Sequence, residues 1–277
     1  MTSPVRPRTP IAADEVVDAA RRSLSADPSR RHKPVVRLVH DGVPYIVKRE
    51  ESRGTRRMRS WLLSAGCAVL FRELVHPARL RAGNLGDEAR RLRQLRTHGA
   101  RVPVVIAEEP EFLVLEDCGE DLADRLGRVA AHERRALLIQ AVDDLSGFHR
   151  GGLWHGAAQL RNLTMKNGLL HRVDFEETAG HALPLDLMQS FDLILFFHSA
   201  FDFLEGDETQ AMTLLRRYFR HVPRAGVTRA LCRIECVTGR LADLESLLAR
   251  LARKHKDVRR ALELARLLRQ FCRSQLA

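Results

Sequence analysis

Residues 153–176 read LWHGAAQLRNLTMKNGLLHRVDFE, and the fold can be worked out from this stretch. Asn167-Gly168 is a strong signal for a two-residue hairpin turn, because both positions of that turn need a positive φ angle. The strands on either side, extended outward from the turn, place Asn162 opposite Val173. Asn162 and Asp174 are therefore expected side by side at the open end of the hairpin.

An amide oxygen and a carboxylate placed in this way suit a hard divalent ion. Proteins bind Mg²⁺ through one or two such oxygens together with the phosphates of a substrate. The pattern thus makes Asn162 and Asp174 candidate metal ligands. The alternative is that both residues simply end their strands, as Asn and Asp commonly do.

Away from this hairpin, the sequence pattern changes near residue 117, from mixed strand and helix to almost continuous helix. It predicts a helix at 13–24, strands at 35–40 and 43–48 around the turn Asp41-Gly42, a helix at 87–98, strands at 102–107 and 111–116, and later helices at 120–127, 132–150, 185–204, 207–221 and 228–273. We expect an α+β protein with a small β-rich N-terminal lobe at 13–117 and a larger, mainly helical C-terminal lobe at 118–277. A cleft is expected between the lobes, and residues 1–12 are expected to be a disordered arm.

Composition supports a folded protein that contacts anions. The chain has 277 residues, of which 45% are hydrophobic, so it is long enough to bury a core and is not a disordered tail. Lys and Arg total 46 against 35 Asp and Glu, and the net charge of +11 favours phosphates, nucleic acid or an anionic membrane. Only five of the basic residues are Lys, so the presence of Lys48 at the end of a strand suggests a specific function. The alternative is that Lys48 is a solvent-exposed residue of an edge strand, as a Lys in a strand commonly is.

The stretch quoted above resembles the catalytic loop and the metal-binding segment of the protein-kinase-like superfamily. In that superfamily, His-Gly-Asp or His-Arg-Asp precedes an Asn by five residues, and a strand then delivers Asp-Phe-Gly. His155, Gly156 and Asn162 match the first motif, and Asp174-Phe175 matches the second. Ala157, however, stands where the catalytic Asp is expected.

Within the superfamily, the chain is most similar to the bacterial lipopolysaccharide-kinase-like branch, which includes Kdo and heptose kinases. That branch commonly has Asp-Phe-Glu, as here with Glu176, a poor Gly-rich loop, and a basic insert, as here at 53–81. The resemblance covers roughly residues 35–205 and implies a bilobal kinase-like fold that binds ATP and Mg²⁺.

The resemblance also implies roles in the N-terminal lobe. Lys48 matches the Lys that holds the α- and β-phosphates, and Glu88 matches the helix Glu that orients this Lys; Glu73 is the alternative partner. Residues 113–117 resemble the segment whose backbone meets adenine, which makes Glu116 a candidate cofactor contact.

In the C-terminal lobe, the resemblance implies that Asn162 and Asp174 hold the metal and that His155 is structural. Asp192 lies inside a very apolar predicted helix, where a charge costs several kcal/mol unless it is hydrogen-bonded. Its match in the superfamily is the Asp that anchors the catalytic-loop backbone.

Ala157 leaves the function open between two hypotheses. In the first, the protein is a kinase that phosphorylates a sugar of the lipopolysaccharide core, because phosphoryl transfer depends mostly on positioning and charge neutralisation. In the second, it is a pseudokinase with a regulatory or structural role in envelope biogenesis, because a methyl group cannot accept a proton. A nucleic-acid-binding protein is a weaker third hypothesis, since the chain has few Trp and Tyr residues for base stacking.

The remaining expectations concern location. The five Cys residues show no paired or zinc-type spacing, and the N-terminus has no secretory signal, so a cytoplasmic location is expected. The insert at 53–81 combines Trp61, Leu62 and Phe71 with several Arg residues, which suits the surface of an anionic inner membrane and a lipopolysaccharide precursor. The alternative is a helix packed on the small lobe.

Overall fold

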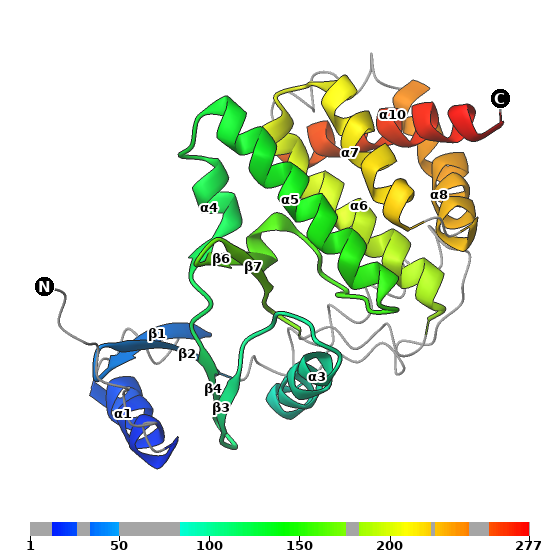
Figure 1. Cartoon of the computed structure of the whole chain (residues 1–277). Helices are drawn as coiled ribbons and strands as arrows, with labels where there is room; N and C mark the ends of the chain where they lie inside the picture. The colour runs from blue at the N-terminus through cyan, green and yellow to red at the C-terminus, as the bar shows by residue number, and fades with distance from the viewer. Residues whose placement is uncertain are drawn as a thin grey trace, which may run out of the picture.

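The computed structural model describes residues 13–26, 34–49, 84–175, 183–222, 225–243 and 255–276. Its N-terminal elements are α1 (Ala13–Ala26), β1 (Val35–His40), β2 (Val43–Arg49), α3 (Leu85–Thr97), β3 (Val105–Glu108) and β4 (Phe112–Glu116). After them come β5 (Glu120–Asp121), α4 (Leu122–Leu126), α5 (Ala131–Arg150), β6 (Leu163–Lys166), β7 (Leu169–Arg172), α6 (Leu185–Leu204), α7 (Glu208–His221), α8 (Ala225–Asp243) and α10 (Lys256–Leu276). The predicted α+β class is confirmed, with an antiparallel sheet followed by a mainly helical region (Figure 1). The predicted arm at 1–12, the insert at 53–81 with Glu73, and Glu176 lie outside the described residues.

The N-terminal sheet is antiparallel, with strand order β1-β2-β4-β3. The predicted turn at Asp41-Gly42 joins β1 to β2, and its φ angles of 49° and 71° are both positive, as a tight hairpin turn requires. In β2, Lys48 pairs with Leu113 of β4. The Lys is therefore carried by an inner strand of the sheet.

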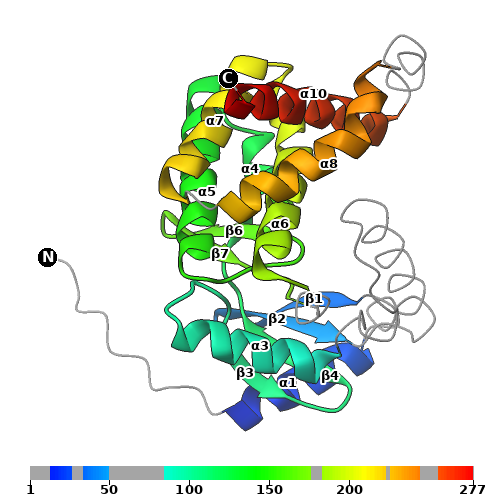
Figure 2. The same cartoon turned by 90° about the vertical axis from the view of Figure 1, so that its right-hand side faces the viewer.

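Each face of this sheet is covered by a helix (Figure 2). The side chains of β4 alternate between the two faces: Phe112 and Val114 pack with α1, and Leu113 and Leu115 pack with α3. The core on the α3 side also contains Phe148 and Phe175, which come from the helical region. The sheet is thus joined to the helical region through a shared core.

The helical region has α6 at its centre. The helices α5, α7, α8 and α10 all contact α6, and their buried apolar side chains form one large core. Among the described helices, α6 is the one long and apolar enough to cross a membrane by length and composition. In this structure, 61% of its most apolar stretch is buried inside the protein, as in the central helix of a packed core.

A short three-stranded sheet, β5-β6-β7, lies beside the helices and carries the hairpin that the sequence predicts. Met165 pairs with Leu170, and the turn residue Asn167 has a φ angle of 53°. The amide of Val173 donates to the carbonyl of Asn162 at 3.0 Å, so the predicted register is confirmed up to the open end.

Four predicted elements differ from the structure. The helix predicted at 120–127 is preceded by the short strand β5 at Glu120–Asp121, and α4 begins only at Leu122, because the Asp121 side chain caps it by accepting from the Ala123 amide at 2.7 Å. Where the structure describes it, the helical pattern at 228–273 forms the separate helices α8 and α10, which pack on each other and on α6 and so bury apolar faces that one long helix would expose. The strand predicted at 102–107 begins only at Val105, because Pro103 has no N–H group for a ladder. The helix predicted at 87–98 begins at Leu85, because the side chain of Asn84 caps it by accepting from the Asp87 amide at 2.8 Å.

Candidate functional site

Lys48 lies between two carboxylates. Its Nζ donates to Glu88 Oε2 at 2.8 Å, to Glu88 Oε1 at 2.9 Å and to Asp174 Oδ1 at 3.0 Å. Lys48 and Glu88 are buried, whereas the side chain of Asp174 is 40% exposed. A buried ammonium needs such partners, because an unpaired buried charge costs several kcal/mol. The structure thus pairs Lys48 with Glu88, and it adds Asp174 as a third member.

The positions of these three residues follow from the elements that carry them. Glu88 lies in the first turn of α3, where the Asn84 cap sets the start of the helix. Its Oε1 also accepts the backbone amide of Phe175 at 3.2 Å, so the same carboxylate binds Lys48 and the segment after β7. Glu88 therefore connects β2, α3 and the Asp174 segment.

Asp174 has a φ angle of 69°, in the left-handed region that non-glycine residues rarely adopt. Such a conformation costs of order 1 kcal/mol and persists only where the surroundings impose it. It places a partly exposed carboxylate beside Lys48. Local strain at a polar residue in a cavity is typical of a functional position.

Asn162 precedes β6 and is buried. Its amide nitrogen donates to the carbonyl of Ala157 at 2.8 Å, which directs the amide oxygen to other partners. Asn162 and Asp174 both line one cavity. Among the described residues, no group of three or more His, Cys, Asp or Glu side chains could hold a metal. The donor set of one amide oxygen and one carboxylate fits Mg²⁺ only when a ligand supplies further oxygens.

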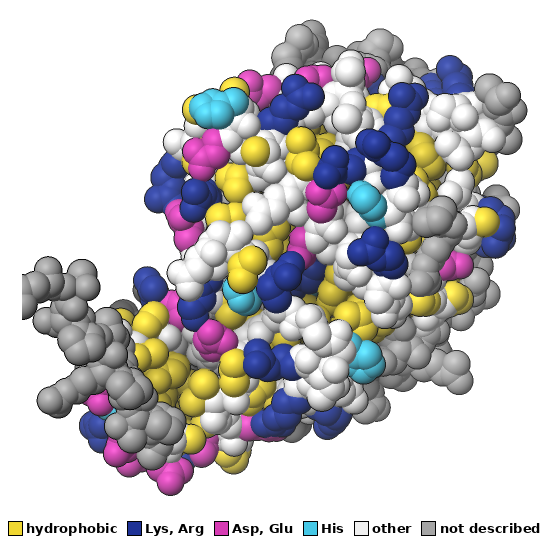
Figure 3. Space-filling model, in the orientation of Figure 1, with side chains coloured by type: hydrophobic (Ala, Val, Ile, Leu, Met, Phe, Trp, Pro, Cys, Tyr) yellow, Lys and Arg dark blue, Asp and Glu magenta, His cyan; other side chains and the backbone are white. Residues whose placement is uncertain are grey.

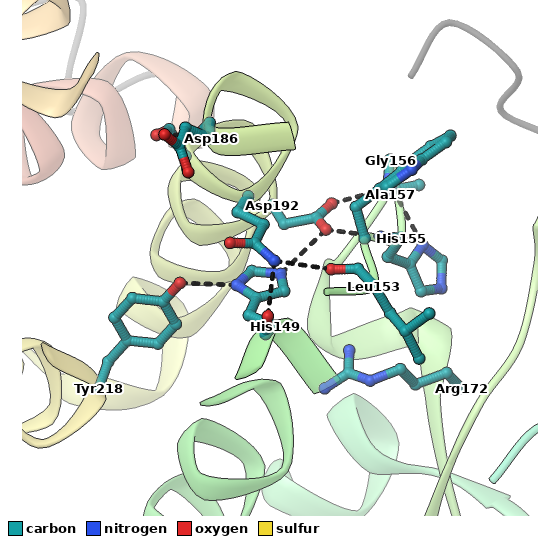
Figure 4. Close-up of polar contacts among 12 residues, drawn as sticks. His149, Leu153, His155, Gly156, Ala157, Arg172, Asp186, Asp192 and Tyr218 are labelled. Atoms are coloured by element: carbon teal, nitrogen blue, oxygen red, sulfur yellow. Dashed lines mark hydrogen bonds and ion pairs between the residues drawn. The ribbon is translucent and has the colours of Figure 1, made fainter. Parts of the chain in front are cut away.

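Asp192 anchors the loop before β6 (Figure 4). Its carboxylate is fully buried and accepts the amides of His155 at 2.6 Å and Gly156 at 2.7 Å, as well as His149 Nε2 at 3.1 Å. Burial alone would raise the pKa of Asp192, but the hydrogen bonds from His149 and from the His155 amide hold this pKa below its ordinary value. The buried charge expected in this apolar helix is thus compensated by donors from the loop.

His155 is held on both ring nitrogens. Nε2 donates to the carbonyl of Val173 at 3.0 Å, and Nδ1 accepts the amide of Ala157 at 3.1 Å. Burial lowers the pKa of His155 to about 3, so the ring is neutral near pH 7. A neutral ring that is used at both nitrogens is a structural group rather than an acid or base.

Ala157 presents only a methyl group at the position where the resemblance expects a carboxylate. Its backbone is fully engaged, since its amide donates to His155 and its carbonyl accepts from Asn162. The loop therefore keeps its shape without a side chain at 157. It has no proton acceptor at this position.

Residues 116–119, which we call the crossing segment, connect the sheet to the helical region. Lys166 Nζ donates to Glu116 Oε1 at 2.7 Å and to the Asp117 carbonyl at 2.9 Å, and Arg37 Nε donates to Asp117 Oδ2 at 2.6 Å. The hydrogen bond to Glu116 raises the pKa of Lys166 above its ordinary value. The side chain predicted as a cofactor contact, Glu116, is therefore bound by Lys166.

Cys118 and Gly119 complete the crossing segment. Burial, assisted by the nearby charge of Glu116, raises the pKa of Cys118 to about 12, so its thiol stays protonated and is a poor nucleophile. Gly119 has a φ angle of 94°, and a Cβ there would lie 2.2 Å from the carbonyl oxygen of Met165. A glycine is needed at this close approach.

A cavity of about 750 Å³ lies between the sheet and the helical region. It is lined by Lys48, Glu116, Asn162 and Asp174. Glu88 does not line the cavity but binds Lys48 at its wall. Its apolar lining comes from both regions and comprises Pro34, Val35, Ile46, Pro103, Leu115 and Val173. The volume is within the range of small-molecule sites. The predicted site residues are thus brought together, except that His155 is buried within the loop and does not line the cavity.

Sequence reasoning missed several contacts of this site. Lys166 and Arg37 bind oxygens of the crossing segment, and Arg91 binds the carbonyls of Trp154 and His155 in the loop. Tyr218 donates to His149, with 2.7 Å between the Tyr218 oxygen and His149 Nδ1, and His149 in turn contacts Asp192. The scarcity of Lys was a usable signal for Lys166. No local pattern distinguishes Arg91 or Arg37 from the many other arginines.

The arrangement of Lys48, Glu88, Asn162 and Asp174 at the cavity indicates a functional site. Comparison with known proteins adds no evidence, since no protein-family model and no curated protein matches the chain.

Proposed function

We propose that this chain has a bilobal, protein-kinase-like fold and binds ATP with Mg²⁺ in the cavity between the sheet and the helical region. The observation that carries the proposal is Lys48, held 2.8 Å from Glu88 and 3.0 Å from Asp174 at the cavity wall. A buried cation, a partly exposed carboxylate and a neighbouring amide oxygen suit a phosphate chain with a hard metal ion. The sequence resemblance supports the same site.

Each residue has a distinct part in this proposal. Lys48 binds the α- and β-phosphates, and Glu88 keeps its ammonium in place. Asn162 and Asp174 hold Mg²⁺, which when bound neutralises charge on the phosphates. The apolar side chains of Ile46 and Leu115 enclose the base, and the backbone of the crossing segment meets its polar edge.

We further propose that the acceptor is a sugar hydroxyl of the lipopolysaccharide core. The grounds are the Asp-Phe-Glu motif and the basic insert at 53–81, which match that branch of the superfamily. The γ-phosphoryl group would pass from ATP to the sugar oxygen with ADP as the leaving group, and without a carboxylate base at 157 the hydroxyl proton would go to water; Gln159 could orient the hydroxyl but not deprotonate it. The protein contribution is then mostly positioning and charge stabilisation.

A pseudokinase is the second candidate, and Ala157 is the observation that favours it. General bases typically contribute about 10²–10⁴-fold to a rate, and no side chain at 157 supplies this. Such a protein would bind nucleotide and regulate a partner in envelope biogenesis.

A nucleic-acid-binding function has less support. On the face shown in Figure 3, acidic side chains lie among the basic ones. The pairs Arg217–Asp143 at 2.5 Å and Arg101–Asp144 at 2.8 Å neutralise part of the basic charge. A site for a nucleic-acid backbone needs basic groups that are free to replace counterions.

Thermal unfolding with ATP alone, Mg²⁺ alone and both together tests the nucleotide site. We expect the melting temperature to rise with ATP and Mg²⁺, because a ligand that binds only the folded state stabilises it. Mg²⁺ alone should have no effect, since the protein offers too few ligands. Asp174→Asn should abolish the metal-dependent part of the rise, and the matched control Asp18→Asn, on the exposed face of α1, should retain it. An unchanged melting temperature at millimolar nucleotide would reject the proposal.

Ala157→Asp separates the kinase from the pseudokinase. We expect no gain in ATP turnover if the wild type works without a base at 157, because the added carboxylate repels the phosphates and Asp174. An increase in ATP turnover of about tenfold or more, toward the 10²–10⁴-fold that a general base typically contributes, would identify the wild type as a pseudokinase.

A further inference from the structure

Arg91 is a buried arginine that the proposed function does not yet use. It lies on α3 three residues after Glu88, with only 7% of the residue exposed. Its Nη2 donates to the carbonyl of Trp154 at 2.9 Å and to that of His155 at 3.1 Å. The guanidinium carbon also lies 3.7 Å from the centroid of the Trp154 ring and 5.1 Å from that of Phe175.

These two carbonyls belong to the same peptide groups that Asp192 holds by their amides. The Trp154 carbonyl and the His155 amide form one peptide group, and the His155 carbonyl and the Gly156 amide form the next. Asp192 accepts from both amides, at 2.6 and 2.7 Å. Two consecutive peptide groups therefore lie between a buried cation on α3 and a buried carboxylate on α6. Hydrogen bonds in such a chain polarise and strengthen one another.

We propose that Arg91 is a positioning residue that fixes α3 against the loop at 154–156 and thereby keeps Glu88 on Lys48. The inference rests on the proposed function, because it concerns the same site. It makes the Lys48–Glu88 pair a permanent feature of the folded protein, which needs no ligand or modification to form.

The spacing on α3 supports this coupling. Residues three apart lie on the same face of a helix, and from this face of α3 Glu88 binds Lys48 while Arg91 binds the loop at 154–156. Moving α3 outward would separate Glu88 from Lys48 and would also remove a guanidinium from two carbonyls and an aromatic face. The two contacts are therefore made or lost together.

The test uses Lys48 as the probe and needs no nucleotide. The chain has five Lys residues, so the rate at which an amine-reactive reagent modifies Lys48 can be followed by mass spectrometry of peptides. Arg91→Met should increase this rate about tenfold or more, because loss of the anchor raises the population of locally open states. Arg91→Lys, which keeps the charge but not the planar group, should give a smaller increase.

Two controls separate positioning from general destabilisation. Arg90→Met removes an exposed arginine from the same helix and should leave the Lys48 rate unchanged. Leu214→Ala creates a cavity in α7, far from α3 in the chain, and should lower global stability without a matching increase at Lys48. If Arg91→Met does not fold, Arg91→Lys is judged by the same criteria.

The proposal would be overturned if folded Arg91 variants were modified at Lys48 at the wild-type rate. It would also be overturned if Leu214→Ala increased the rate of Lys48 modification as much as Arg91→Met does. Calorimetric titration with ATP and Mg²⁺ keeps the two proposals distinguishable. If wild type binds and Arg91→Met binds about tenfold more weakly, a loss of about 1.4 kcal/mol, both are supported. If wild type does not bind, the proposed function fails, and the labelling result alone decides the role of Arg91.

Discussion

Asp192→Ala is expected to be strongly destabilising, because Asp192 anchors the loop before β6. The carboxylate is 0% exposed and accepts three hydrogen bonds, from the amides of His155 and Gly156 and from His149. Truncation leaves these donors buried without their acceptor, and each unsatisfied donor costs about 1–3 kcal/mol. Because the three share one partner and the site relaxes partly, we expect a total loss of about 3–5 kcal/mol, as found on breaking buried ion pairs.

Urea unfolding at pH 7 measures this loss, with Asp174→Ala as the comparison. The Asp174 side chain is 40% exposed and Lys48 keeps Glu88 without it, so its removal should cost at most about 1 kcal/mol. Both variants should keep the wild-type dependence on urea concentration, since the surface exposed on unfolding does not change. Equal midpoints for the two variants would refute the assignment of Asp192 as the buried anchor.

Three further predictions follow from backbone strain and burial. Burial lowers the pKa of His155 to about 3 from an ordinary value of 6.5, so between these pH values the unfolded chain binds a proton that the folded protein does not. As pH falls through this range, His155 should lower the free energy of unfolding by up to about 1.4 kcal/mol per pH unit. In His155→Gln, the plot of unfolding free energy against pH should be shallower by about one proton between pH 4 and 6.5. Asp174→Gly should be about 1 kcal/mol more stable than Asp174→Ala in urea unfolding, because only glycine relieves a φ of 69°, and equal stabilities would show that the backbone is not strained. Gly119→Ala should lower the unfolding free energy by about 3 kcal/mol or more, because the new Cβ would clash with the backbone oxygen of Met165. Gly99 has a φ of 74° but open space around it, so Gly99→Ala should cost only about 1 kcal/mol, and similar losses in the two variants would contradict the close approach at Gly119.

The sequence was informative where local chemistry decides the structure. Asp41-Gly42 and Asn167-Gly168 each require a specific turn, and the register of both hairpins follows from those turns. The neighbourhood of Asn162 and Asp174 was predictable for the same reason. The contact of Lys48 with Glu88 joins distant elements, and it was anticipated only through resemblance to a family.

The remaining contacts were not predictable because their acceptors carry no sequence signature. Arg91 binds two backbone carbonyls, and every residue has a carbonyl. Lys166 and Arg37 bind the crossing segment across large separations in the chain, so although the scarcity of Lys marks Lys166 as unusual, the sequence does not give the partner of either residue. The separation of α8 from α10 within the pattern at 228–273 likewise depends on packing against α6, which local periodicity does not encode.

The shared core beneath α3 determines whether the N-terminal part of the chain can fold without the helical region. Phe148 and Phe175 belong to the helical region by sequence, yet they complete the apolar core around Leu92 that holds α3 to the sheet. A fragment ending near residue 117 would keep Lys48 and Glu88 but would expose this half-built core to water. The boundary near 117 therefore separates the mixed sheet and helix elements from the helical region, but the shared core means that neither part is expected to fold when expressed alone.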